Sequence, residues 1–125
     1  MTPSGSIVQP SMRLNEKALL SEILQAGQHI QQFTAEKNEH DFAGSLLLRS
    51  AVERQFEIVG EALNRLGKND SSLLESIRNY RRIIAFRNIL AHDYDRVDEG
   101  IVWDIIQRDL PVLLEDAAEL LAKDE

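Results

Sequence analysis

One row of apolar side chains constrains the fold of this chain more than any other feature. Between residues 48 and 66 a row of apolar residues recurs at spacings of four and three, which places them on one stripe of an α-helix. The row predicts a long helix over about residues 41–66 that ends at Gly67. Its members are Leu48, Val52, Phe56, Val59, Leu63 and Leu66.

A second row with the same spacing predicts a helix over about residues 12–33, with a buried stripe of Leu19, Ile23, Ala26, Ile30 and Phe33. Both rows continue for several turns, as in the long antiparallel helices of a bundle. No strand-type alternation occurs anywhere in the chain. The sequence therefore predicts an all-α helical bundle of four to five helices, with the first two long and antiparallel.

A third helical region covers about residues 71–91. Ser71 or Ser72 is the expected N-cap, with Glu75 near the distance of a capping box. Whether this region breaks near residues 79–80 is left open by the pattern.

A last helix is predicted from Asp98, the expected N-cap, to about residue 122. Pro111 lies inside it and predicts a kink, because proline has no N–H to donate. The residues assigned to its buried side are Ile101, Ile105, Leu113 and Leu120.

The length of 125 residues suits one domain. Residues 1–11 hold two of the three prolines and show no period, so they are predicted to be a disordered tail, with a single helical domain over residues 12–125. No apolar run approaches the ~18 residues of a membrane span. The chain has no cysteine and shows no secretion signal at its start, which favours a cytoplasmic protein.

The net charge of −7 argues against phosphate binding by the whole surface. A local basic cleft remains possible, because "RNYRRIIAFR" places four arginines in ten residues without an acid: Arg78, Arg81, Arg82 and Arg87. The acids concentrate elsewhere, notably in "LLEDAAELLAKDE" at residues 113–125.

The stretch "RNILAHDYD", residues 87–95, carries the candidate catalytic group. In a helix Asn88 and His92 share a face and Arg87 lies ~100° away, so all three are expected to line one side of a cavity. Histidine exchanges protons near neutral pH, and arginine binds phosphate oxygens in a fork. The competing interpretation is that Arg87 and His92 are ordinary helix-end residues, which is the commoner role for such residues taken singly.

A histidine and an arginine are the minimum for cleaving RNA without a metal ion. The ribose 2′-OH supplies the nucleophile, and the protein moves protons and stabilises charge on phosphorus. The motif supplies only one histidine per chain, whereas the reaction needs two proton transfers. A two-fold dimer would bring two copies of the motif to one cleft.

The spacing of Arg87, His92 and Tyr94 resembles the R-x4-H-x-Y motif of HepT-type toxins in the HEPN superfamily. The resemblance continues in "AVERQFEIVGEALNRL", with its E-R-x3-E-x2-G-E-A pattern, and in "YRRIIAFRNILAHDYDRVDEGIVWDIIQRDLPVLLED". It covers about residues 12–122.

This resemblance implies a HEPN-like bundle that forms a homodimer, and a metal-independent ribonuclease toxin acting on cellular RNA, with tRNA one candidate. It implies a cognate MntA-type nucleotidyltransferase antitoxin, as in type VII-like toxin–antitoxin pairs. That enzyme would neutralise the toxin by transferring AMP to Tyr94. Arg87 and His92 would be catalytic, and Asn88 would support the site.

Other polar residues are weaker candidates for the site. Glu57 and Glu61 could form a paired carboxylate with a supporting role, although such pairs on a long helix are more often bonded to nearby arginines, here Arg54 or Arg65. Gly60 is predicted to allow a close helix contact.

The sequence predicts neither a metal site nor a cofactor. His29 and His40 lack a ligand spacing for metal, and Trp103 is assigned to the core. A second hypothesis is that the motif is retained but does not catalyse a reaction. The chain would then be a helical interaction module that binds a nucleotidyltransferase partner or a nucleotide.

Overall fold

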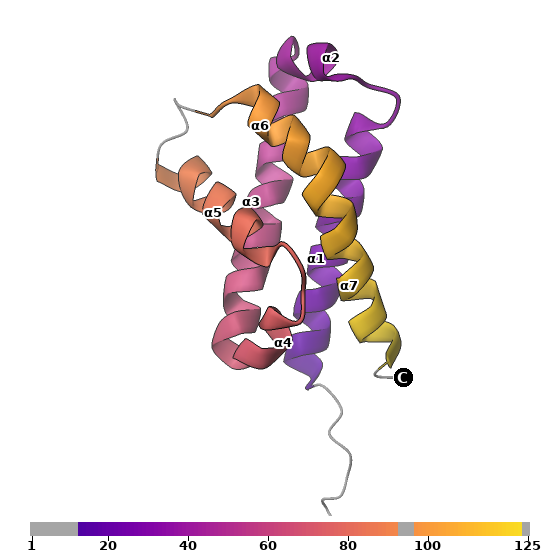
Figure 1. Cartoon of the computed structure of the whole chain (residues 1–125), viewed down its shortest axis with the longest axis vertical. Coiled ribbons are helices and arrows are strands. Elements are labelled where there is room, and N and C mark those ends of the chain that lie inside the picture. The colour runs from indigo at the N-terminus through magenta and orange to yellow at the C-terminus, as the bar shows by residue number, and fades with distance from the viewer. Residues whose placement is uncertain (1–12, 93–96, 124–125) are drawn as a thin grey trace, which may run out of the picture.

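The computed structural model describes residues 13–92 and 97–123. Two long antiparallel helices, α1 (Leu14–Thr34) and α3 (Leu46–Asn69), pack along each other and form the centre of the bundle (Figure 1). α7 (Leu110–Lys123) packs on α1, and α5 (Tyr80–His92) packs on α3. Short helices α2 (Glu39–Ala43), α4 (Ser71–Glu75) and α6 (Glu99–Asp104) connect them. The predicted all-α class is confirmed.

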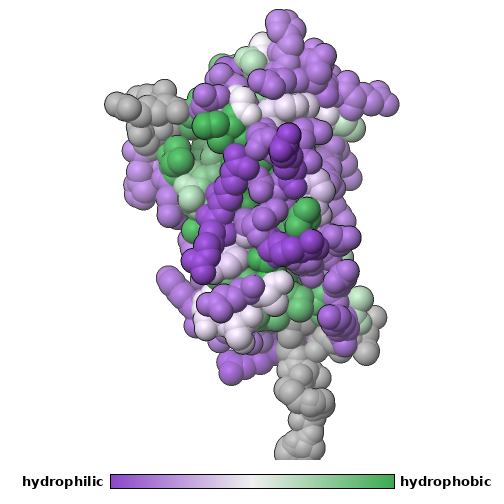
Figure 2. Space-filling model, in the orientation of Figure 1, coloured by the Kyte–Doolittle hydropathy of each residue, from purple (hydrophilic) through white to green (hydrophobic). Residues whose placement is uncertain are grey.

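The core forms where the apolar stripes of α1, α3, α5 and α7 meet. On α3 the predicted row is confirmed from Val52 onward, because Val52, Phe56, Val59, Leu63 and Leu66 are fully buried, whereas Leu48 is only partly buried. Outside this core, the face drawn in Figure 2 is mainly hydrophilic, with apolar side chains in small patches. No helix within residues 13–92 and 97–123 is both long and apolar enough to cross a membrane.

On α1 the buried stripe differs by one position at each end from the prediction. Leu20 is fully buried in place of the partly buried Leu19, and Thr34 is buried in place of Phe33, which is 36% exposed. The four–three spacing through Ile23 and Ile30 continues to residue 34, so Phe33 lies ~100° off the stripe. Its ring stacks instead on His29, with 6.1 Å between the ring centroids.

The helix predicted over residues 41–66 is two helices. α2 ends at Ala43 with Gly44 as its C-cap, and α3 begins after Ser45, whose hydroxyl accepts a hydrogen bond from the Leu48 N–H at 3.1 Å. A serine at this position satisfies an otherwise unpaired N–H of the first turn.

Gly67 does not end α3, which continues to Asn69. A Cβ atom at residue 67 would lie 2.6 Å from the Leu74 Cδ2 atom, so this glycine makes room for α4. The N-cap of α4 is Asp70, which accepts from the Leu73 N–H at 3.1 Å, and not Ser71 or Ser72. The expected capping box with Glu75 is therefore wrong.

The third helical region does break where the pattern left the question open. α4 ends at Glu75, and α5 begins at Tyr80, directly after Asn79, whose φ of 68° lies in the left-handed region. The predicted N-cap at Asp98 is confirmed, since its carboxylate accepts from the N–H groups of Gly100 and Ile101 at 2.7 and 3.3 Å.

Pro111 is accommodated by a π-helical turn, Ile105–Asp109, directly before α7. In this turn the Leu110 N–H donates to the Ile105 carbonyl, five residues back. Single π turns often absorb an irregularity in a helix. Ile101 was assigned to the buried side but is 51% exposed, so that assignment is wrong.

Candidate active site

Arg87 lies at a close contact between α5 and α3. A Cβ atom at Gly60 would lie 2.4 Å from the Arg87 Cβ atom, so the contact requires a glycine at residue 60. The approach is fixed by the rings of Phe56 and Phe86, which meet edge to face with centroids 5.1 Å apart. The predicted close contact at Gly60 is confirmed.

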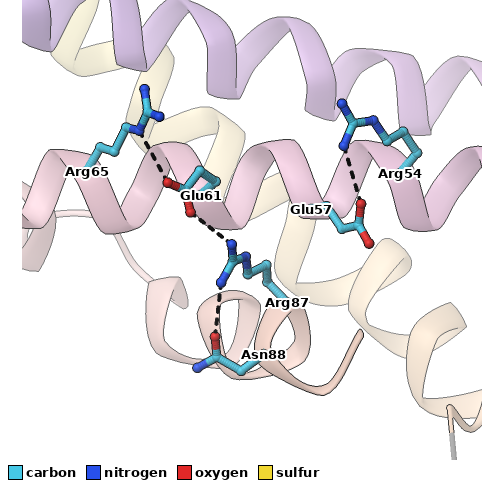
Figure 3. Close-up of polar contacts among 6 residues, drawn as sticks. All are labelled: Arg54, Glu57, Glu61, Arg65, Arg87 and Asn88. Atoms are coloured by element: carbon cyan, nitrogen blue, oxygen red, sulfur yellow. Dashed lines mark hydrogen bonds and ion pairs between the residues drawn. The ribbon is translucent and has the colours of Figure 1, made fainter. Parts of the chain in front are cut away.

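Glu61, the next residue of α3, holds the guanidinium of Arg87 (Figure 3). The Arg87 Nη2 atom donates to Glu61 Oε1 at 2.9 Å, and the Arg65 Nε atom donates to the other carboxylate oxygen at 3.2 Å. The Arg87 Nη1 atom faces Asn88 Oδ1 at 3.5 Å. Glu61 therefore bridges two arginines and gives Arg87 a defined direction.

The predicted bonding of the two glutamates to nearby arginines is confirmed, because Glu57 contacts Arg54 at 3.4 Å and Glu61 contacts Arg65. The sequence analysis did not predict the contact between Glu61 and Arg87. The signal that could have indicated it was Gly60, which marks the place where another helix comes close.

These side chains line a hollow of about 420 Å³ between α1, α3 and α5. Arg87, Arg54 and Arg65 contribute three positive charges, against three glutamates. A guanidinium that is 28% exposed and pre-oriented at such a hollow can bind a phosphate in a fork. The glutamates of the lining are Glu22, Glu57 and Glu61.

Asn88 and His92 lie on the neighbouring, exposed side of α5, and His92 is its last residue. Among the described residues Arg87 and Ala91 line the hollow from α5, whereas Asn88 and His92 do not. Within the described residues, this hollow therefore does not bring the three side chains together. Tyr94 lies outside the described residues.

The arginine run does not form one basic cleft. The Arg78 guanidinium and its backbone N–H bind Asp116, with the Nη2–Oδ1 distance at 2.8 Å, and Arg82 binds Asp109 at 2.6 Å and Asp104 at 2.9 Å. The hydrogen bonds from Arg78 lower the pKa of Asp116 below its ordinary value. Arg82 on α5 and Arg78 just before it are both held by acids of the C-terminal helices, so these two arginines do not contribute to the basic cleft that the sequence left possible.

One carboxyl near the hollow is electrostatically unusual. Burial raises the pKa of Glu53 on α3, and the nearby charges of Glu57 and Glu99 raise it further, while Arg49 opposes them. Glu53 begins the family pattern noted in the sequence, but that pattern gave no sign of its burial or of Glu99 nearby.

The all-α bundle, with Arg87 and His92 on one helix, is consistent with the HEPN-like fold that the sequence resemblance implied. The chain belongs to the Ribonuclease HepT-like family, which it matches over residues 23–120. The predicted resemblance and the predicted enzyme class, a ribonuclease, are confirmed by this membership.

Curated relatives agree with the family. The chain is 32% identical over 102 residues to "Probable ribonuclease HepT" of Thermococcus cleftensis, covering 82% of this chain and 92% of that protein. It is 33% identical over 110 residues to "Gamma-glutamylcyclotransferase and putative RNase" of Methanocaldococcus jannaschii, covering 88% of this chain. The chain spans about half of that longer relative, 49% of its length. No solved structure matches the chain.

Proposed function

We propose that this chain is the toxin of a toxin–antitoxin pair and cleaves cellular RNA without a metal ion, at a cleft completed by a second copy of itself. The observation that carries the proposal is the placement of Arg87. Its guanidinium is pre-oriented by Glu61 at a polar hollow, within five residues of His92 on the same helix.

The proposed reaction is an internal phosphoryl transfer. The ribose 2′-oxygen attacks phosphorus, the new O–P bond forms, and the bond to the 5′-oxygen breaks. A base removes the 2′-OH proton and an acid protonates the leaving oxygen. His92 is assigned to proton transfer, and the Arg87 fork stabilises the added negative charge on the phosphoryl oxygens. Asn88 supports the orientation of Arg87.

A second copy supplies what one chain lacks. Each chain offers one His92, exposed at the end of α5 and outside the hollow that Arg87 lines. A two-fold axis beside α5 would bring the exposed histidine of each chain toward the cleft, with one acting as base and the other as acid. Light scattering at micromolar concentration should then give about twice the chain mass of 14.2 kDa. A monomer that cleaves RNA would overturn the shared cleft.

Control by an antitoxin completes the proposal. An MntA-type nucleotidyltransferase would transfer AMP from ATP to the hydroxyl of Tyr94, two residues beyond His92. The adduct brings a phosphate and an adenosine to the motif. The phosphate would compete for the position that Arg87 keeps for the scissile phosphate.

Substitution of the two motif residues tests the proposal. We expect His92→Ala and Arg87→Ala to lose RNA cleavage by ~10²–10⁴-fold, the usual contribution of acid–base catalysis, while the far-ultraviolet circular dichroism is unchanged. Arg87→Lys should also fail, because lysine keeps the charge but loses the fork. The matched control is Lys37→Ala, which removes an exposed charge between α1 and α2.

Cleavage at near wild-type rate in both alanine variants would place the chemistry elsewhere. A wild-type protein that binds RNA and leaves it intact would favour the interaction module over the enzyme. Membership of a ribonuclease family favours the enzyme.

A further inference from the structure

Arg81 stands apart from the other arginines of its run. Arg78, Arg82 and Arg87 are each held by carboxylates, whereas Arg81 forms no ion pair with any residue that the structure describes. Its guanidinium lies over the ring of Tyr80, with 5.1 Å from Cζ to the ring centroid. This cation–π contact orients the guanidinium and leaves its donors for a ligand.

The position of Arg81 relates it to the motif. Asn88 and His92 follow it by seven and eleven residues, close to whole helical turns, so the three lie within ~20° of one line along α5. All three are exposed. At a rise of ~1.5 Å per residue, Arg81 lies ~16 Å from His92 along the helix axis. A strand of RNA following this line would pass Arg81 a few nucleotides from the scissile bond.

A hollow adjoins Arg81 at the start of α5. Its volume is about 660 Å³, and it is lined by Asn79, Tyr80 and Arg81 together with the carboxylates of Glu75 and Asp109. The left-handed turn at Asn79, with its φ of 68°, separates α5 from the segment before it. The hollow thus offers space for a base beside the Arg81 guanidinium, which can bind a phosphate.

We propose that Arg81, held by Tyr80, forms a distal substrate subsite that binds a backbone phosphate of single-stranded RNA, with the neighbouring base in the hollow at the start of α5. The subsite rests on the proposed ribonuclease function and adds a binding residue to it. Arginine suits this role, because its planar guanidinium can bind a phosphate oxygen and stack on a base. Arg81 is a binding residue and takes no part in the bond-breaking step.

Substrate length tests the subsite directly. On a long single-stranded RNA, Arg81→Ala should raise KM several-fold and leave kcat unchanged, because the lost contact is distant from the reacting atoms. On a dinucleotide, which ends before the subsite, wild type and Arg81→Ala should be equal. Lys37→Ala serves as the matched control, since it removes one exposed charge far from α5 in the sequence.

Salt dependence gives a second readout that structural damage would not produce. Binding of a 2′-O-methylated RNA, which cannot be cleaved, is measured over a range of salt concentration. The slope of log affinity against log salt should fall by ~0.7 in Arg81→Ala, the value for one phosphate contact in a single strand. Tyr80→Phe should keep the wild-type slope and Tyr80→Leu should weaken binding, since phenylalanine retains a ring under the guanidinium.

The outcomes separate the two proposals. If wild type neither binds nor cleaves RNA, the proposed function and the subsite are both overturned. If wild type cleaves RNA, and Arg81→Ala has the KM and salt slope of Lys37→Ala, only the subsite is overturned. A change of self-association in Arg81→Ala with unchanged RNA affinity would also overturn it, and would assign the residue to a contact between copies.

Discussion

Gly60 and Arg87 are in direct contact, and only because residue 60 lacks a side chain: a Cβ atom there would lie 2.4 Å from the Arg87 Cβ atom. The motif arginine is thus placed by a glycine on another helix, 27 residues earlier in the chain. The contact joins packing to function, because the adjacent Glu61 can reach Arg87 only when α5 lies this close.

Gly60→Ala should therefore lower both stability and RNA cleavage. By helix propensity alone alanine would stabilise α3 by ~1 kcal/mol. Overpacking against a Cβ atom of another helix costs about 1–3 kcal/mol, and this cost should win. Urea unfolding measures the stability, and an RNA degradation assay measures the activity.

Gly27→Ala is the matched control. Its Cβ atom would meet the Leu114 Cδ2 atom at 2.4 Å, at the end of a side chain that can rotate away, and far from α5. It should be better tolerated and should keep cleavage. Equal activity in the two variants would show that the close approach at Gly60 does not position Arg87.

Glu61→Ala should reduce kcat by roughly tenfold or more, since a hydrogen bond to a charged group contributes about 1.5–3 kcal/mol. Glu61→Gln should recover much of this, because the amide oxygen can still accept from Arg87. Glu57→Ala is the comparison, since Glu57 pairs with Arg54 and not with Arg87. A larger loss in Glu57→Ala than in Glu61→Ala would contradict the positioning role of Glu61.

Asp116→Asn should destabilise the fold at pH 7 and lose its effect in acid. The pKa of Asp116 is lowered in the folded state, chiefly by the hydrogen bonds from Arg78. A carboxyl of this kind stabilises the fold above its unfolded pKa of ~3.9, and the stabilisation disappears as the pH falls through the folded value. Unfolding curves of wild type and variant should therefore converge below about pH 4. Glu115→Gln, at the exposed partner of Arg78, should change stability much less.

EDTA should leave RNA cleavage unchanged, because the proposed reaction uses only a histidine and an arginine. The measurement is the initial rate with and without the chelator, followed by addition of Mg²⁺. Inhibition by EDTA that Mg²⁺ reverses would show that the metal-independent mechanism is wrong.

Tyr94→Phe should escape neutralisation while retaining at least part of its RNase activity. Incubation of wild type with an MntA-type nucleotidyltransferase, ATP and Mg²⁺ should add AMP to Tyr94, mapped by peptide mass spectrometry, with activity lost in step. Neutralisation of Tyr94→Phe by the same treatment would show that control does not pass through this hydroxyl.

The sequence by itself determined the all-α class, the buried stripe of α3 and the motif. Hydrophobic periodicity is a property of neighbouring turns, so the stripe of α3 and the cap at Asp98 could be read from residues within a few positions of each other. The spacing of Arg87 and His92 is equally local, and with the family pattern around it this was enough to predict the class of enzyme.

The partners of the charged side chains were decided only by the tertiary structure. Asp116 lies 38 residues from Arg78, and Glu61 lies 26 residues from Arg87, so no local pattern connects them. Which carboxylate an arginine meets depends on how closely and at what rotation two helices pack. The same packing paired Arg78 and Arg82 with acids, away from the basic cleft that the sequence left possible, and left the guanidinium of Arg81 without an ion pair among the described residues.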